Sequence, residues 1–466
     1  MLKFGKVVVA AIVATIASTA SYSRAQSPLD EAAESAKLAS RQAETRTFLM
    51  AHAKPIAAAD AAYNASEFEP LLPMVKGKRL ILVSEPTHGT HETRLENAKI
   101  VRFLVERVGV RTLIPELGYA EGLELDALVR RGVGDTDTIV KNDMGVLWNT
   151  TEQADMMRWI AGWNKAHPKD MVRIAGMDEE SGTMAGPALA KLTAGMKLDS
   201  SLVARVKAGA EAADAMKGPA KVNASDAEKK ASADYDAALV DLIAVVKTLP
   251  ESPAKDDAWR SAMSVRSGRR TAEMRMEGKD GSDAGSRLRE FEMARAALSF
   301  IAESSAPSVI VTHTVHLRAG RLTPQDKVQS VGYHLARALG DRAFFLGEEY
   351  GVGSMRAFVP TTGTEPANAP RRLHAAVFDR PAPGSIAAAL GSTGPLLIDL
   401  RDPRDGSPWS DWLESMQATH LYPAITYEAG DASKPNWTVP ADAFDALIYI
   451  PSVTPLRPIG EAVYVP

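Results

Sequence analysis

Short apolar runs alternate with amphipathic stretches through two parts of the chain. Runs of four or more apolar or β-branched residues next to turn residues indicate buried strands, and they occur at 80–85, 110–116, 171–178, 308–313, 343–348, 396–400 and 446–450. Apolar residues at the spacing of one buried helix face occupy 95–108, 121–131, 154–166, 289–303 and 331–339. This alternation predicts an α/β fold with a mostly parallel central sheet flanked by helices.

The composition shifts between residues 186 and 286. Ala, Lys, Asp and Glu dominate there, no β-branched run occurs, and the segments 236–249 and 257–277 have helical periodicity. We therefore expect a helical insertion or cap at 186–286, whose charges form a solvated face. The α/β core would comprise 78–185 and 287–466, preceded by an N-terminal helical segment at 26–77.

The first 25 residues have the pattern of a secretory signal peptide. Lys3 and Lys6 precede an apolar stretch at 7–20, and Ser23-Arg24-Ala25 offers a cleavage site near Ala25. The apolar stretch is short for a transmembrane helix, and no later segment is apolar for long enough. These features predict an exported protein, periplasmic or secreted, that has no membrane contact after cleavage.

Charge and cysteine content narrow the function classes. The full chain has a net charge of −4, which becomes −7 once the three basic residues of the signal peptide are removed. No basic face for nucleic acid is evident, so we expect no nucleic-acid partner. The absence of cysteine excludes disulfides, thiolate metal sites and cysteine nucleophiles.

Ionisable residues follow five of the expected strands. In a parallel sheet the carboxyl ends of the strands share one edge, where ligands bind. The residues at that edge would be Glu85 with His88, Glu116, Asp178, His313 with His316, and Glu348. By contrast, His91 is expected to face solvent in a first helical turn, and His167, His334, His374 and His420 have no placement that argues for function.

Two chemistries suit this set of residues. A neutral histidine could act as general base on water, with a glutamate orienting its ring and a second histidine assisting the leaving group. Alternatively, Glu85, His88 and the pair His313 and His316 could bind a divalent metal that activates water. A serine hydrolase is disfavoured because the chain has no Gly-x-Ser-x-Gly elbow.

Several motifs, in order, resemble those of the erythromycin esterase family. The segment from Ser84 to Glu92, Ser-Glu-Pro-Thr-His-Gly-Thr-His-Glu, is similar to the family's Gly-Glu-x-Thr-His-Gly-x-x-Glu motif. Further similarities lie at Glu116, Trp148 with Glu152, Trp159 and Asn164, Gly176 to Asp178, Arg289 to Ala294, Thr312 to His316, and Phe444 with Asp445. The chain differs from the family pattern at Ser84, Pro86, Asn97 and Thr314, and the antibiotic esterases carry a basic residue at the position of Asn97.

The resemblance implies hydrolysis of an ester, with macrolide lactones as substrates of some members, and no metal or other cofactor. Carried over, His88 would be the general base on water. Glu85 and Glu116 would orient or polarise the reacting groups, and His313 and His316 would complete the site. Arg289 would anchor the pocket or stabilise the oxyanion. We also expect substrate contacts from Glu92, Asn97, Trp148 and Asp178. A metal-dependent hydrolase and a non-enzymatic periplasmic protein that binds haem or another small ligand remain alternatives.

Overall fold

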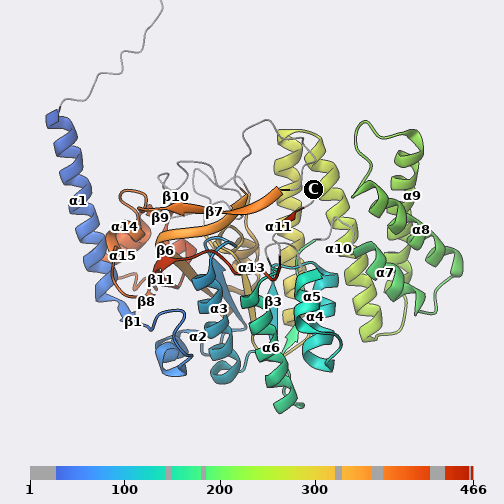
Figure 1. The fold of residues 1–466 in the computed structure, drawn as a ribbon, viewed down its shortest axis with the longest axis horizontal. Helices are drawn as coiled ribbons and strands as arrows, with labels where there is room; N and C mark the ends of the chain where they lie inside the picture. The colour runs from blue at the N-terminus through green and yellow to red at the C-terminus, as the bar shows by residue number, and fades with distance from the viewer. Residues whose placement is uncertain are drawn as a thin grey trace, which may run out of the picture.

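The computed structural model describes residues 28–142, 148–179, 185–320, 328–358, 371–419, 436–460 and 463–464. The predicted signal peptide and its cleavage site lie outside these ranges. A mixed, mostly parallel sheet crosses the centre of the molecule, with helices on both faces (Figure 1). The predicted α/β class is confirmed.

The sheet has ten described strands. Six neighbouring strands are parallel, in the order β11-β6-β2-β5-β3-β4. Beyond β11, β8 pairs antiparallel with β11, and β1 pairs antiparallel with β8. Strand β7 pairs with the far end of β6, and β12 pairs with β7. The strand bounds are β1 Ala53–Pro55, β2 Leu80–Glu85, β3 Thr112–Pro115, β4 Arg173–Ile174, β5 Ser308–His313, β6 Ala343–Phe358, β7 Arg371–Phe378, β8 Leu396–Asp399, β11 Ala446–Val453 and β12 Val463–Tyr464. A separate two-stranded sheet joins β9 Gln417–Thr419 to β10 Asn436–Thr438.

Successive side chains of a strand point to opposite faces of the sheet, and both faces are buried here. Ile81 and Val83 of β2 pack into one hydrophobic core, whereas Leu80 and Leu82 pack into another. This is why the central strands read as continuous apolar runs rather than as alternating patterns.

Each core is covered by its own set of helices. The core that contains Ile81 is covered by α2 Leu72–Val75, α3 His91–Phe103, α4 Tyr119–Arg131, α5 Thr136–Asn142 and α6 Thr151–Ala166. The core that contains Leu80 is covered by α1 Pro28–Ala51, α11 Lys279–Ala302, α12 Thr314–Leu317, α13 Val331–Leu339, α14 Ile386–Leu390, α15 Pro408–Glu414 and α16 Pro440–Ala443.

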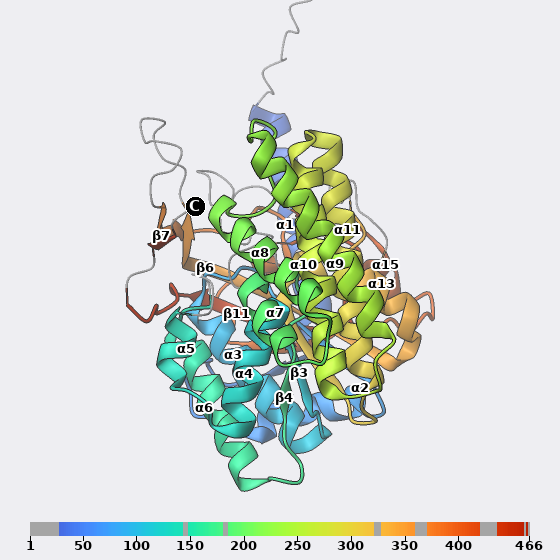
Figure 2. The ribbon, with the colours of Figure 1, turned by 90° about the vertical axis from the view of Figure 1, so that its right-hand side faces the viewer.

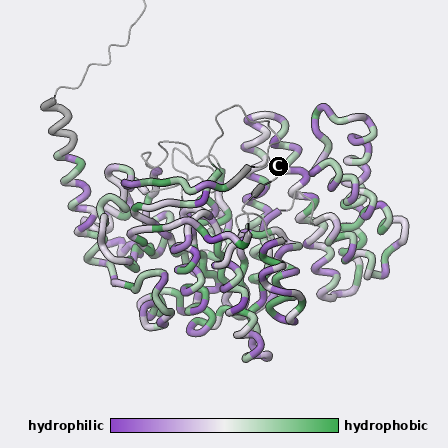
Figure 3. Tube along the Cα trace, in the orientation of Figure 1, coloured by the Kyte–Doolittle hydropathy of each residue, from purple (hydrophilic) through white to green (hydrophobic). Residues whose placement is uncertain are grey.

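Residues 185–276 form four helices beside one edge of the sheet (Figure 2). They are α7 Ala185–Ala194, α8 Ser200–Met216, α9 Asp226–Lys247 and α10 Pro253–Met276. Apolar residues of these helices form a third core, which includes Val206, Leu239 and Val265. Hydrophilic and hydrophobic positions alternate along the four helices (Figure 3), as expected for amphipathic helices that pack on one another.

The sequence misjudged the extent of several elements. The strand expected at 171–178 shortens to β4, with a single further bridge between Asp178 and Gly118. The strand expected at 343–348 continues to Phe358, because its second half pairs with β7 and with the end of β11. Within the described residues, no helix is long and apolar enough to cross a membrane.

Candidate active site

The order of the strands brings distant residues to one edge of the sheet. Strand β5 lies between β2 and β3, although residues 116–307 separate it from β3 in the chain. In this register Glu85 at the end of β2 lies beside His313 at the end of β5, and Glu116 directly follows β3. Glu85, Glu116, His313 and the nearby His88 therefore lie together at the carboxyl ends of the strands.

His88 is held between two carboxylates. Its Nδ1 lies 2.5 Å from Oε1 of Glu85, and its Nε2 lies 3.7 Å from Oε2 of Glu116. The other oxygen of Glu85 lies 3.1 Å from Nε of Arg94. With Nδ1 donating to the Glu85 carboxylate, Nε2 is the ring nitrogen that this contact leaves available.

Glu116 contacts both cationic and neutral donors of the site. Its Oε2 accepts hydrogen bonds from the hydroxyl of Thr312 and from the backbone N–H of His313, the latter at 3.0 Å. Its Oε1 lies 3.3 Å from Arg289 and 3.2 Å from Nε2 of His316. Burial alone would raise the pKa of Glu116, but His316, His88 and Arg289 lower it well below the usual value, so Glu116 is ionised.

His316 bridges two carboxylates. Its Nε2 faces Glu116, and its Nδ1 lies 2.7 Å from Oε1 of Glu290. Burial opposes the charge on the ring, but Glu290 and Glu116 outweigh it and raise the pKa of His316 to about 10. His316 is therefore an imidazolium at neutral pH, in a position to act as a cation rather than as a base.

His313 has a different environment. Its Nε2 donates to the carbonyl oxygen of Pro86 at 2.9 Å, and its Nδ1 accepts from the N–H of Val315 at 3.3 Å. Burial, helped by His88, lowers the pKa of His313 to about 3, so the ring is neutral. Both nitrogens bond to the backbone, and the ring thereby joins the end of β5 to the loop that carries His88.

Arg289, on α11, reaches the site from the opposite face of the sheet. It forms a two-point ion pair with Asp178, at 2.9 and 2.5 Å, and also contacts Glu116. Burial disfavours the charge, but Asp178 and Glu116 raise the pKa of Arg289 well above its usual value. Arg289 therefore stays charged at the rim of the site.

The four expected substrate contacts have different surroundings. Trp148 packs on His88, with ring centroids 4.8 Å apart, and Asp178 binds Arg289. Both carboxylate oxygens of Glu92 bond to the backbone and hydroxyl of Thr454, which ties α3 to the end of β11. Asn97 is buried, and neither atom of its amide has a partner among the described residues.

The prediction that His91 faces solvent is wrong. His91 is buried, and its Nδ1 bonds to Glu152, which lies in the first turn of α6 and also accepts from the N–H of Arg457. The sequence did not reveal this partner because it lies 61 positions away.

Sequence reasoning also overlooked Glu290, Thr312 and Arg94 as members of the site. Glu290 and Thr312 stand inside the motifs that contain Arg289 and His316. Arg94 follows His91 by one helical turn and points toward the same edge as Glu85. Their positions next to motif residues are the only local signal of their role.

No group of three or more His, Asp or Glu side chains in the described residues has the arrangement that a metal ion needs. Two of the ligands of the metal alternative have other contacts: Glu85 contacts His88 and Arg94, and both nitrogens of His313 bond to the backbone.

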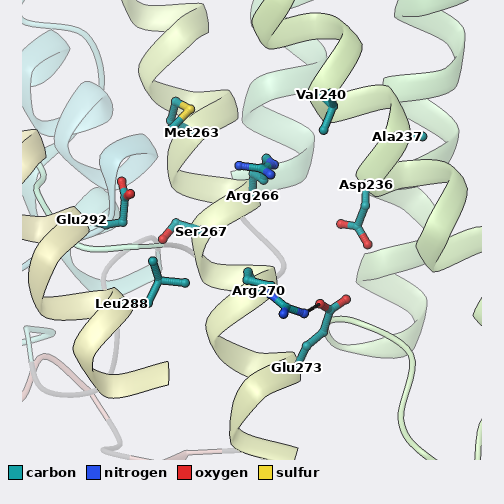
Figure 4. Close-up of a pocket in the computed structure, with 10 residues that line it drawn as sticks. All are labelled: Asp236, Ala237, Val240, Met263, Arg266, Ser267, Arg270, Glu273, Leu288 and Glu292. Atoms are coloured by element: carbon teal, nitrogen blue, oxygen red, sulfur yellow. Dashed lines mark hydrogen bonds and ion pairs between the residues drawn. The ribbon is translucent and has the colours of Figure 1, made fainter. Parts of the chain in front are cut away.

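A separate cleft of about 410 Å³ lies between α9, α10 and α11 (Figure 4). Three acidic residues line it, and each is paired with an arginine: Asp236 with Arg269, Glu273 with Arg270, and Glu292 with Arg295. None of the site residues predicted from the sequence lines this cleft.

Known proteins resemble the chain in sequence. YbfO of Bacillus subtilis, named as a candidate hydrolase, is 25% identical over 151 residues, which are 32% of each chain. Erythromycin esterase type II of Escherichia coli is 27% identical over 115 residues, 25% of this chain and 27% of that protein. The matched part thus spans about a third or less of these two relatives.

Solved structures share the fold over most of the chain. A Bacillus cereus protein has a TM-score of 0.72 at 21% identity, covering 89% of this chain and 98% of that one. An erythromycin esterase mutant in its open conformation has a TM-score of 0.61 at 16% identity, covering 84% and 94%. At these identities the likeness shows the fold alone.

The family comparison extends further along the sequence than the individual relatives do. The erythromycin esterase family pattern matches residues 105–453, which include Glu116, Asp178, Arg289, His313 and His316. The chain therefore belongs to the erythromycin esterase family.

Proposed function

We propose that this protein is a hydrolase that cleaves an ester bond with a water molecule activated by His88. The observation that carries the proposal is the geometry of His88: Nδ1 is fixed by Glu85 at 2.5 Å, which leaves Nε2 as the base. Family membership supports hydrolase chemistry. Ester specificity rests on the family resemblance and on the name of the Escherichia coli relative.

The mechanism follows from the charges around His88. Nε2 takes a proton from water, and the resulting hydroxide attacks the ester carbonyl carbon. Glu85 stabilises the imidazolium that forms at His88, as a carboxylate does in hydrolytic triads. Arg289 and His316, whose raised pKa values keep them cationic, would stabilise the oxyanion. The C–O bond then breaks, and the imidazolium returns its proton to the leaving alkoxide, which yields an acid and an alcohol.

For the substrate we propose a lactone or other ester of the macrolide class. The family name and the named relatives support this class. We also propose that the protein is exported and that its mature form begins near Gln26, on the basis of the residues before it. N-terminal sequencing of the protein recovered from cells tests the export proposal, which fails if the first 25 residues are retained.

The function is tested with the protein and a panel of macrolides and simple esters, with and without a chelator. Hydrolysis appears in the mass spectrum as the gain of one water. His88→Ala should lower the rate at least about 100-fold, because a general base contributes this much or more. The control His374→Ala, at an exposed position on β7, should keep the wild-type rate.

Two outcomes would contradict the proposal. If His88→Ala keeps more than about a twentieth of the rate, His88 is not the base. If the chelator abolishes turnover and zinc or manganese restores it, the reaction depends on a metal.

A further inference from the structure

Glu348 is a buried carboxyl that the proposed mechanism does not use. It lies on β6, is 3% exposed, and neither of its carboxyl oxygens has a hydrogen-bond partner among the described residues. Leaving a buried carboxyl without partners costs free energy. Such a group calls for an explanation other than stability.

The ladder between β2 and β6 ends shortly before Glu348. Strands β2 and β6 pair from Leu80 and Ala343 as far as Val83 and Leu346. Beyond that point the N–H of Glu348 donates to the hydroxyl of Ser84 at 2.9 Å, so a side chain takes the place of the ladder. Ser84 is one of the positions at which the chain departs from the family motif.

Glu348 and Glu85 lie on the same face of the sheet. The alternation along β2 and β6 puts Glu85 with Val83, and Glu348 with Leu346, on the face that α3 covers. The charged groups that act on Glu348 are Glu85 from β2 and Arg94 and Glu96 from α3. Glu348 also lines a small cavity together with Glu349 and Arg318.

Other buried polar atoms in this region also lack partners among the described residues. They include Nη2 of Arg94, the amide of Asn97 and Oε1 of Glu96. Arg94 and Asn97 are one turn apart on α3, so their side chains share a face. Groups of this kind are normally satisfied by ordered water.

Burial, together with Glu96 and Glu85, raises the pKa of Glu348 well above its usual value, while Arg94 opposes the shift only in part. The raised pKa favours the protonated carboxyl, which can donate a hydrogen bond. A second negative charge beside Glu85 would compete for Arg94 and disturb the Glu85–His88 contact.

We propose that Glu348 is a positioning residue for the Glu85–His88 pair, acting as an uncharged hydrogen-bond donor toward Glu85 through ordered water. Glu85 then remains the one carboxylate that faces both Arg94 and His88. This inference rests on the proposed role of His88 as the base.

The test compares Glu348→Leu with the conservative variant Glu348→Gln. Leucine removes the donor, so kcat on a hydrolysed ester should fall about tenfold, the effect of one lost hydrogen bond. KM should not change, because the proposed role of Glu348 is to position Glu85 and His88 and not to bind the substrate. Glutamine keeps an uncharged donor and should restore kcat to within about threefold of wild type.

Thermal unfolding separates positioning from a structural role. Leucine removes the cost of burying a carboxyl that has no partner among the described residues, so the Glu348→Leu midpoint should equal or exceed that of wild type. If both variants melt at clearly lower temperature than wild type, or if Glu348→Leu keeps full activity, the inference is overturned.

An infrared measurement tests the inference without any substrate. At neutral pH the absorption of protonated carboxylic acid should be stronger in the wild-type protein than in Glu348→Gln, in which Glu96, with its pKa raised to about 7, still contributes. Identical spectra would overturn the inference. If the wild-type protein cleaves no ester, the proposed function fails, and this comparison alone decides whether Glu348 is protonated.

Discussion

At the scale of single residues, Glu116 compensates two cations at once, the buried His316 and the partly exposed Arg289. Arg289 and His316 both contact its Oε1. Glu116→Gln would leave these cations with less compensation in a region of low solvent access. Breaking a buried ion pair in this way costs about 3–5 kcal/mol. The variant should also lose about 100-fold in rate, because Arg289 and His316 would shift from their positions.

Urea denaturation and ester turnover measure the two effects of Glu116→Gln. The matched control is Asp234→Asn, which breaks an exposed ion pair with Lys230 on α9. That change should alter the free energy of unfolding by about 0.5 kcal/mol or less. Equal stability losses in the two variants would show that Glu116 does not hold the site together.

His316 makes the stability depend on pH. Its pKa is raised from 6.5 in the unfolded chain to about 10 in the folded protein. Its stabilising contribution is therefore fully present below pH 6.5 and is lost as the pH rises through about 10. His313, with its lowered pKa, affects stability only on the acid side of pH 6.5.

We expect the unfolding free energy of the wild-type protein to decline between pH 6.5 and about 10 more steeply than that of His316→Gln. The comparison with the variant removes the contributions of all other groups that titrate in this range. Parallel stability curves for the two proteins would mean that His316 is not charged in the native state.

At the scale of elements, Gly89 lies where three segments meet. Its carbonyl oxygen accepts from the N–H of Arg356 on β6, at 2.9 Å, and of Leu456 after β11, at 3.0 Å. A Cβ atom at Gly89 would collide with the carbonyl group of Arg356. The glycine next to His88 thus permits close contact between the loop that carries His88 and two strands.

Gly89→Ala should therefore cost about 1–3 kcal/mol, the usual range for overpacking, and should lower ester turnover by displacing His88. The control Gly162→Ala, in an open position of α6, should be neutral or stabilising by up to about 1 kcal/mol. Thermal unfolding and activity assays compare the two variants. A Gly89→Ala protein with full stability and activity would contradict the proposed close contact.

Local periodicity predicted some elements accurately. β5 and α13 have the bounds that the sequence indicated, because their apolar residues follow the strand and helix periods without interruption. The second half of β6 could not be predicted in this way. Glycines at 351 and 353 interrupt its apolar pattern, and the pairing with β7 and β11 that stabilises it is non-local.

The same distinction applies to the site. Glu85, Glu116 and His313 were predictable because each stands at a strand end, and parallel strands share an edge. The pairing of His91 with Glu152 and the burial of Glu348 were not, since they depend on the order of the strands and on the packing of α3. Sequence patterns give the position of a residue along its element, but its partners depend on tertiary structure.

At the scale of the whole molecule, α10 connects the helices of residues 185–276 to the site. Ser264 donates to the carbonyl oxygen of Asp178, and Thr271 donates to Glu179 at 2.8 Å. Asp178 in turn holds Arg289. A displacement of α10 would therefore shift Asp178 and Glu179, and Asp178 would shift its ion-pair partner Arg289.

These helices also have a core of their own, centred on residues such as Leu239, which is fully buried. Leu239→Ala should destabilise this part by about 2–5 kcal/mol through the loss of packing. If the part opens as its own cooperative unit, hydrogen exchange should speed up across residues 185–276 and stay slow in β2 and β5. The matched variant Leu82→Ala, in the sheet core, should instead speed up exchange in the central strands. Faster exchange throughout the molecule in Leu239→Ala would show that the helices and the sheet unfold as one unit, and that the sheet cannot keep its site when the helices open.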